Sequence, residues 1–242
     1  MTQALFRDDA TLRECTACVV AHAEGGVLLD RSVFYPQGGG QAGDAGTLVL
    51  ADGTTLAIID THKSKETPGA TVHLVAPGSD LVAFAPGVSV TARIDWARRH
   101  RHMRFHTATH LLCALVPHPV DGCSITADYA RLDFHMTEPL DKALLTEGLA
   151  RLVAAAHAVG QRWISEDELD ANPGLVRSMS VQPPRGMGRV RLLEIDGIDL
   201  QPCGGTHVAN TREIGAVIVT KIEKKSAMTR RVVLGFAEPA EG

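Results

Sequence analysis

Glycine and proline occur at short intervals in the first 90 residues, and these turn-forming residues limit the region to short secondary-structure elements. Breaks such as Asp52-Gly53, Pro68-Gly69 and Pro86-Gly87 separate short, strand-like segments. The predicted strands cover residues 18–20, 26–29, 47–50, 55–59, 71–74 and 88–94. Many short strands at this spacing are typical of a small barrel or sandwich, and we expect a small β-barrel-like domain.

The sequence changes character after the last of these strands. Apolar residues recur at helical spacing over 96–116, where Pro117 ends the pattern, and again over 141–159. Further strands are predicted over 130–136, 189–195, 214–221 and 230–235, the last three in a second, mixed sheet. Helices and strands are interspersed rather than strictly alternating, which favours the α+β class. We therefore predict a β-rich domain over 1–92, containing a glycine-rich motif, and an α+β domain over 93–242.

The overall charge excludes a protein that is basic throughout. The formal net charge is −4, so any contact with a nucleic acid must come from a local basic patch. Aromatic residues make up only 4% of the chain, which argues against a binder of single strands built on stacked aromatic platforms. Hydrophobic residues make up 45%, which is enough for a buried core.

Cysteine usage and the distribution of apolar residues indicate the cellular setting. The five cysteines lack the even spacing of a disulfide framework. No run of about 18 apolar residues is available to span a membrane, and the N-terminus carries acids rather than the apolar segment of a signal peptide. We expect a cytoplasmic protein without membrane contact, and a monomer is the favoured state.

Two short segments carry residues typical of a metal site. His106 and His110 are four positions apart on the predicted helix, which places both imidazoles on one face, one turn apart. Cys203 and His207 flank a Gly-Gly pair that lets the backbone turn tightly. Three nitrogen donors and one sulfur donor suit tetrahedral Zn²⁺. The alternatives are a polar stripe on the helix, and a buried cysteine beside an unrelated histidine.

Ligand number alone favours a structural zinc over a catalytic one. Four protein ligands normally close the coordination sphere, whereas a catalytic zinc keeps a position for water. The residues around the ligands, rather than the ligands themselves, shift this balance.

Four ordered motifs resemble one known family. Residues 105–112 (FHTATHLL), and residues 203–208 (CGGTHV) followed by NTREIG, resemble the editing domain of alanyl-tRNA synthetase and its free-standing relatives, the AlaX alanyl-tRNA editing proteins. Residues 131–134 (RLDF) are similar to a strand between these motifs, and residues 34–41 (FYPQGGGQ) to the family's glycine-rich motif. The resemblance spans about residues 30 to 235 and implies a free-standing protein of the medium-length AlaX kind.

The resemblance implies a zinc-dependent aminoacyl-tRNA deacylase. Its partner would be the acceptor end of tRNA(Ala) carrying a wrong amino acid, either serine or, as a further substrate, glycine, and its hydrolysis would protect the fidelity of translation. Two alternatives stay open. Residues 120–124 lack a glutamine that is usual in the family, so the substrate could be a different mischarged tRNA. The protein could also be a non-catalytic tRNA-binding module stabilised by zinc.

The catalytic candidates combine the metal ligands with two threonines beside them on the predicted helix. The threonines are expected to offer hydroxyls to the substrate or to the ligands, and ordinary helix threonines are an equal alternative. The set is His106, His110, Cys203, His207, Thr107 and Thr109.

The candidates for contact with the substrate or the tRNA lie in the glycine-rich motif and just before the first ligand. Glycines allow a close backbone approach, and arginines bind phosphates. A flexible hairpin loop and a solvated basic helix face are the respective alternatives. These candidates are Gly38, Gly39, Gly40, Gln41, Arg98, Arg99, Arg101 and Arg104.

Overall fold

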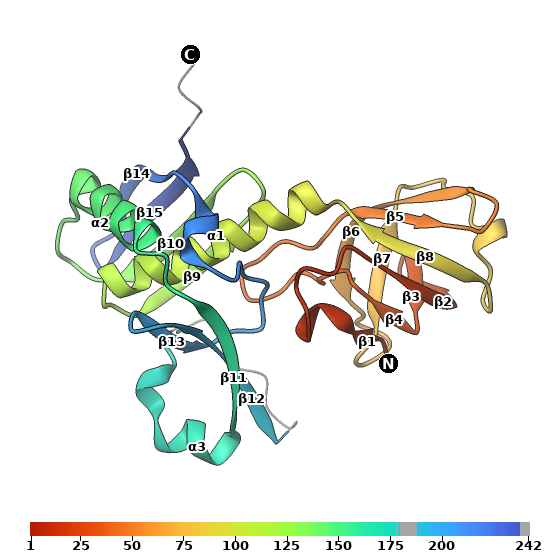
Figure 1. Cartoon of the computed structure of the whole chain (residues 1–242), viewed down its shortest axis with the longest axis horizontal. Helices are drawn as coiled ribbons and strands as arrows, with labels where there is room; N and C mark the ends of the chain where they lie inside the picture. Colours follow the sequence, from red (N-terminus) through yellow and green to blue (C-terminus); the bar gives the residue numbers. More distant parts are fainter. Residues whose placement is uncertain (178, 180–187, 238–242) are drawn as a thin grey trace. The chain divides into compact units, whose positions relative to one another are not determined.

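The computed structural model describes residues 1–177, 179 and 188–237 (Figure 1). The chain divides into two compact units. The first contains Met1–Gly38 and Ala42–His100, and the second contains Gly39–Gln41 and Arg101–Gly242. Part of the glycine-rich motif therefore belongs to the same unit as residues far downstream.

A closed six-stranded barrel dominates the first unit. Its strands pair in the order β2-β3-β7-β6-β5-β8, and each of these pairings is antiparallel. The strands are β2 (Glu14–Ala23), β3 (Gly26–Leu29), β5 (Gly46–Val49), β6 (Thr55–Lys63), β7 (Thr71–Val75) and β8 (Ser89–Ile94). The unit also contains β1 (Gln3–Ala4), β4 (Arg31–Ser32) and the 3-10 turns η1 (Leu5–Arg7) and η2 (Val82–Phe84). The predicted barrel is confirmed, and each predicted strand of this region overlaps one of its six strands.

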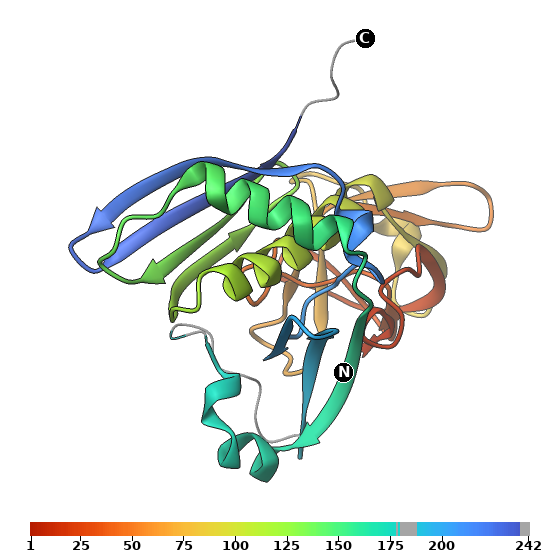
Figure 2. The ribbon, with the colours of Figure 1, turned by 60° about the vertical axis from the view of Figure 1, so that its left-hand side comes forward.

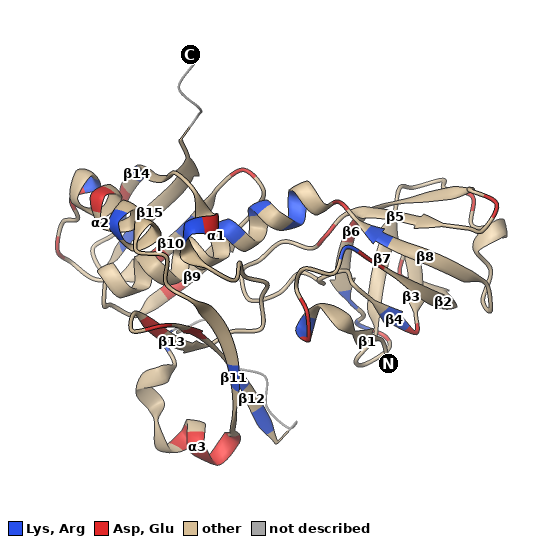
Figure 3. Cartoon of the chain, in the orientation of Figure 1, with Lys and Arg blue, Asp and Glu red and all other residues tan. Residues whose placement is uncertain are grey.

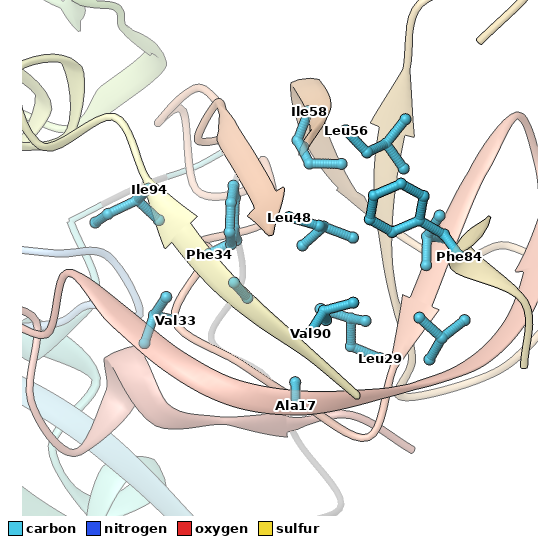
Figure 4. Close-up of a cluster of buried hydrophobic side chains, with 13 residues drawn as sticks. Ala17, Leu29, Val33, Phe34, Leu48, Leu56, Ile58, Phe84, Val90 and Ile94 are labelled. Atoms are coloured by element: carbon cyan, nitrogen blue, oxygen red, sulfur yellow. The ribbon is translucent and has the colours of Figure 1, made fainter. Parts of the chain in front are cut away.

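An apolar cluster fills the barrel (Figure 4). Alternate residues of a strand point to opposite faces, so every strand contributes one face to the interior. Leu29, Leu48, Phe84 and Val90 are almost completely buried there, together with Phe34 from the loop after β4. Full burial of a side chain of this size contributes roughly 1.5–3 kcal/mol. The cluster is therefore the main source of stability in this unit.

The helix α1 (Trp96–Leu115) leads from the first unit into the second. It begins after Asp95, whose side chain accepts a hydrogen bond from the backbone N–H of Arg98 at 3.0 Å. It ends just before Pro117, which cannot donate the next helical hydrogen bond. The predicted helix over 96–116 is confirmed.

Two further α-helices lie in the described part of the second unit. The helix α2 (Lys142–Ala154) is capped by Asp141, and α3 (Glu166–Ala171) begins with a capping box. Gly148 of α2 faces the side chain of Leu115 at the end of α1, where an added Cβ would lie only 2.9 Å from a methyl carbon. A glycine therefore lets the two helices approach closely.

Two antiparallel sheets complete the described part of the second unit. One has the order β14-β15-β10-β9, and Figure 2 shows α1 and α2 on the same side of it. Its strands are β9 (Val120–Ile125), β10 (Ala130–His135), β14 (Val217–Ser226) and β15 (Thr229–Phe236). The other has the order β11-β12-β13, with strands β11 (Val159–Ser165), β12 (Arg189–Ile195) and β13 (Asp199–Pro202). The turns η3 (Pro173–Leu175) and η4 (Thr211–Ile214) are short 3-10 segments.

The α+β class is confirmed, but the prediction of a single mixed second sheet is wrong. The strand β12 belongs to one sheet, whereas β14 and β15 belong to the other, and their pairings are antiparallel. The second predicted helix also extends too far. It ends at Ala154, because Ala156 adopts a left-handed φ of 57° before the chain enters β11.

Among the described residues, no helix combines the length and the apolar character needed to cross a membrane.

Candidate metal centre

The helix α1 supplies two of the four candidate ligands. His106 and His110 are both buried, and their ring centroids are 5.5 Å apart. The threonines between them bond back to the helix: Thr107 donates to the carbonyl oxygen of Met103 at 2.9 Å, and Thr109 donates to that of His106 at 2.7 Å. Both imidazoles therefore project from a regular helix, one turn apart, as predicted from their spacing.

The segment after β13 brings in Cys203 and His207. Within it, Gly205 lies so close to the ring of His106 that an added Cβ would overlap the imidazole. Gly204 has open space around it instead. Of the two adjacent glycines, only Gly205 is required by a close approach.

The four candidate ligand atoms lie within 4.8 Å of one another. The sulfur of Cys203 is 3.4 Å from Nε2 of His106 and 3.2 Å from Nε2 of His207. Atoms bound tetrahedrally to zinc at about 2.0–2.3 Å are roughly 3.3–3.8 Å apart. The donor set suits one tetrahedral metal ion, and the two sulfur–nitrogen distances are close to those such an ion requires.

Gln41 fixes the orientation of the His106 ring. Its side-chain oxygen accepts a hydrogen bond from the backbone N–H of Thr206 at 3.1 Å and lies 2.8 Å from Nδ1 of His106. Because a backbone N–H can only donate, the contacting atom of Gln41 is an acceptor, and Nδ1 of His106 must carry the proton. Nε2 of His106 is left with its lone pair, which is the form that binds a metal.

The other two histidines have acceptors of their own. Nδ1 of His110 donates to the carboxylate of Asp199 at 2.8 Å. Nδ1 of His207 lies 3.3 Å from the hydroxyl of Thr107, whose own proton is already donated to Met103. All three imidazoles thus hold Nδ1 on a protein oxygen, which leaves Nε2 as the nitrogen that a metal would take.

The electrostatics of the cluster also favour a cation. Burial raises the pKa of the Cys203 thiol, but His106 and His207 outweigh burial and bring that pKa well below its ordinary value. Burial lowers the pKa of His207 to about 3. Burial acts in the same direction on His110, but Asp199 and Cys203 oppose it and raise the pKa of His110 to about 9. A bound metal would therefore displace a proton from His110.

The glycine-rich motif is divided between the two units. The carbonyl oxygen of Gly38 accepts a hydrogen bond from the Tyr35 hydroxyl in the first unit. In the second unit, Gly40 has a φ of 86°, and its carbonyl accepts the backbone N–H of Ile125 at 2.8 Å. Gly39 also has a positive φ, of 59°. The two glycines thus carry the backbone into position for Gln41, which contacts the candidate ligand His106 rather than an open surface.

The four candidate arginines occupy different environments. Arg98 is half-buried and donates to the carbonyl oxygen of Gly43. Arg101 and Arg104 are half-buried in the second unit, where their guanidinium carbons lie 5.1 and 3.8 Å from the ring centroid of Phe236. For these three arginines, a contact with tRNA phosphates stays a prediction.

Arg99 differs from the other three because it is completely buried in the first unit. It forms an ion pair with the buried carboxylate of Asp44 and donates to the carbonyl oxygens of Val33 and Ala10. Its guanidinium is therefore a structural group of that unit rather than a phosphate contact.

Sequence reasoning missed three residues that support the ligands. Asp199 holds His110, and Gln201 donates to Asp199 at 2.9 Å. Arg191 donates to the carbonyl oxygens of Cys203 and Gly205 at 3.1 and 2.8 Å. Asp199 and Gln201 could have been found by their spacing from Cys203. Residues two apart in an extended segment lie on one side of it, so these three side chains share a face.

Family profiles match both halves of the chain. The profile described as "Threonyl and Alanyl tRNA synthetase second additional domain" matches residues 190–233. The profile of class II (A) tRNA synthetases matches residues 3–98. These matches define the class: the chain is built from segments related to aminoacyl-tRNA synthetases.

Individual relatives narrow the class to a family. The alanyl-tRNA editing protein AlaX-M of Methanosarcina mazei is 32% identical, over 100% of this chain and 99% of its own length. AlaX-M of Methanosarcina acetivorans is 33% identical over 96% of this chain and 98% of its own length. The alanine–tRNA ligase of Metallosphaera sedula is 34% identical over 92% of this chain, which corresponds to 25% of the ligase. The chain belongs to the AlaX family of alanyl-tRNA editing proteins, and the predicted resemblance is confirmed.

Proposed function

We propose that this protein is a zinc-dependent hydrolase that removes serine, and also glycine, from mischarged tRNA(Ala) in the cytoplasm. Membership in the AlaX family supports the substrate. One observation carries the chemistry: three imidazoles, each with Nδ1 bonded to a separate oxygen, converge with Cys203 within 4.8 Å. A cluster of donors arranged in this way is suited to binding a metal ion.

The proposed ligands are His106, His110, Cys203 and His207. When bound, Zn²⁺ would supply positive charge that polarises an ester carbonyl or a nearby water. Gln41, Asp199 and Thr107 act as positioning residues because they fix the three ring tautomers. Thr109, whose proton is donated to the helix, can still accept a hydrogen bond from the substrate through its remaining lone pair.

The proposed reaction is the hydrolysis of one ester bond. The oxygen of water forms a bond to the carbonyl carbon of the amino acid, and the bond from that carbon to the ribose oxygen breaks. One proton of the water ends on the ribose oxygen, and the products are the free amino acid and the tRNA with its terminal hydroxyl restored. Proton transfer by a positioned group contributes typically about 10²–10⁴-fold to such a reaction.

We also propose that the tRNA reaches this site along a basic stretch of α1, with Arg98, Arg101 and Arg104 meeting phosphates. Gly38, Gly39 and Gly40 are proposed to let the backbone approach the acceptor end. Each phosphate contact should make binding weaker at higher salt.

One observation favours a second function. Four protein donors fill a tetrahedral zinc site, as they do in structural zinc sites. Under that alternative the protein would bind tRNA without hydrolysing it.

The test is the hydrolysis of tRNA(Ala) charged separately with serine, glycine or alanine, with and without a chelator. We expect zinc-dependent release of serine and glycine and little release of alanine. The His106→Ala variant should lose both zinc and activity, whereas His118→Ala, a half-buried histidine outside the cluster, should keep both. Undiminished hydrolysis by zinc-free protein would overturn the proposal. Full tRNA binding with no hydrolysis of any charged tRNA would establish the alternative.

A further inference from the structure

The strands β11, β12 and β13 carry a single aromatic side chain, that of Trp163 in the second half of β11. The Trp163 side chain is 43% exposed. The chain contains two tryptophans, Trp96 and Trp163. Four consecutive residues of this strand, from Gly160 to Trp163, are exposed, and β11 forms an edge of its sheet. The ring therefore stays accessible to a partner, and tryptophan is enriched among the residues that contribute most to binding.

Trp163 shares a row across the sheet with a candidate metal ligand. In the register of β11 and β12 it pairs directly with Arg191. On the other side of β12, the backbone N–H of Cys203 donates to the carbonyl oxygen of Arg191. Residues opposite one another in such a row present their side chains on the same face. Trp163, Arg191 and Cys203 therefore lie side by side, and two strand spacings of about 4.8 Å place the tryptophan roughly 10 Å from the ligand.

Two arginines on this face add positive charge. Arg189 pairs with Ser165, so it lies on the same face as Trp163, and its guanidinium carbon is 4.7 Å from the centre of the tryptophan ring. Arg191 lies between the ring and the ligand segment, where it donates to the carbonyl oxygens of Cys203 and Gly205. Figure 3 shows the basic residues on β11 and β12 and the acidic start of α3 beyond them.

The acidic residues limit what this face can bind. Glu166, Asp167 and Glu168 form the first turn of α3, directly after β11. Their charge would repel a phosphate chain that continued past the end of the strand. Arg162 and Glu194 point to the opposite face, because they alternate with Trp163 and Arg191. The favourable surface is thus short, and it suits one or two unpaired nucleotides rather than a duplex.

We infer that Trp163, Arg189 and Arg191 form a docking surface for an unpaired nucleotide near the 3′ end of the tRNA. A base stacks on the exposed part of the Trp163 ring, Arg189 holds the ring and an adjacent phosphate, and the ester at the terminal ribose reaches the metal centre. This inference rests on the proposed function. It uses a single aromatic platform, which a chain with 4% aromatic residues can supply.

The first test uses the fluorescence of Trp163 in the full-length, zinc-loaded protein carrying Trp96→Phe, so that only one tryptophan reports. The probes are two uncharged RNA hairpins that copy the acceptor stem, one with the unpaired 3′ nucleotides and one with a blunt end. We expect strong quenching by the first and little by the second. Equal quenching by both hairpins, or none by either, would overturn the inference. Neither result depends on whether the protein hydrolyses an ester.

The second test measures kinetics with serine-charged tRNA(Ala) and with a small serine ester that lacks RNA. For Trp163→Ala we expect the KM for the tRNA to rise about 5- to 150-fold, the range that the loss of one stacked base produces. The kcat and the hydrolysis of the small ester should stay unchanged, and Trp163→Phe should restore most of the affinity. The matched control is Leu144→Ala, which removes another exposed apolar side chain, 66% exposed, from α2.

Other outcomes distinguish a failure of the docking surface from a failure of the proposed function. An unchanged KM for Trp163→Ala, with normal hydrolysis by the parent protein, would overturn the docking surface and leave the proposed function intact. Loss of self-association in that variant, with unchanged RNA binding, would also overturn it and identify the face as a contact between copies of the chain. If no ester is hydrolysed by the parent protein, the proposed function fails, and the fluorescence test still decides the docking surface.

Discussion

Both units bury histidines, and the two units use them differently. In the barrel, His73 is fully buried, and its two ring nitrogens contact the Ser32 hydroxyl at 2.7 Å and the Val27 carbonyl oxygen at 3.0 Å. In the second unit, His106 has Nδ1 on Gln41 and Nε2 facing Cys203. A histidine with both nitrogens bonded inside the fold has no lone pair to offer, whereas His106 does. The environment of the second nitrogen, rather than burial, distinguishes a ligand from a structural histidine.

The arginines repeat this contrast. Arg99 is buried in the first unit, and its donors are used by Asp44 and backbone carbonyls. Arg189 lies on an exposed face of the second unit, over the ring of Trp163. Arg99 thus has its donors used inside the first unit, whereas Arg189 stays accessible to solvent in the second.

The largest effects are expected when one histidine is removed from each unit. We expect His106→Ala to lose its bound zinc and to lower deacylation by more than about 100-fold, the upper range for merely supporting residues. His73→Ala should destabilise the barrel by about 1–3 kcal/mol, because it leaves the Ser32 hydroxyl without its partner. Zinc analysis, deacylation assays and urea unfolding measure these effects. If His73→Ala lost zinc as completely as His106→Ala, the distinction between the two sites would not hold.

The buried ion pair of the first unit gives the next largest effect. Arg99→Met should lower the free energy of unfolding by about 3–5 kcal/mol, because the Asp44 charge is left buried without a partner. Arg98→Met, at a half-buried neighbour, should cost less than about 1 kcal/mol. Chemical denaturation monitored by circular dichroism compares the two. A small decrease in the free energy of unfolding of Arg99→Met, together with weaker tRNA binding, would indicate that Arg99 contacts phosphates.

The supporting residues of the metal centre should have a smaller effect than the ligands. Gln41→Ala releases the His106 ring and should weaken zinc binding by about 10- to 100-fold. Gln37→Ala provides a matched control, since Gln37 belongs to the same glycine-rich motif but is exposed. Competition with a chelator of known affinity measures both. Equal affinities in the two variants would remove Gln41 from the metal centre.

The smallest effect concerns the two adjacent glycines of the ligand segment. Gly205→Ala places a methyl group against the His106 ring and should cost about 1–3 kcal/mol, with weaker zinc binding. Gly204→Ala meets open space and should stay within about 0.5 kcal/mol of the parent. Thermal unfolding with and without zinc resolves the pair. A reversed order would show that the close approach at Gly205 is not maintained in solution.

The sequence predicted the elements that have strong local signals. The barrel strands stand between glycine and proline turns, and α1 is bounded by Asp95 and Pro117, so they could be located well. The convergence of the four candidate ligands was predictable in part, because His106 and His110 share a helix face and Cys203 and His207 share a short turn. The strands β9, β11 and β13 were missed, since short exposed or polar strands form through pairing with distant partners rather than through local preference.

The supporting contacts could not be predicted in the same way. Gln41 meets Thr206 across 165 positions of sequence, and His110 meets Asp199 across 89, so no local pattern connects them. The burial of Arg99 had the same cause: its run of basic neighbours resembled a phosphate-binding surface, but tertiary contacts with Asp44 turned it inward.

The converging donors of the second unit are proposed to hold a zinc ion on which ester hydrolysis depends. The most direct test strips the metal from the parent protein and restores zinc stepwise while the hydrolysis of serine-charged tRNA(Ala) is measured. We predict activity that is lost on stripping, rises in proportion to the added zinc and levels off at one ion per chain. Hydrolysis at the full rate in stripped protein, with His106→Ala equally active, would contradict it.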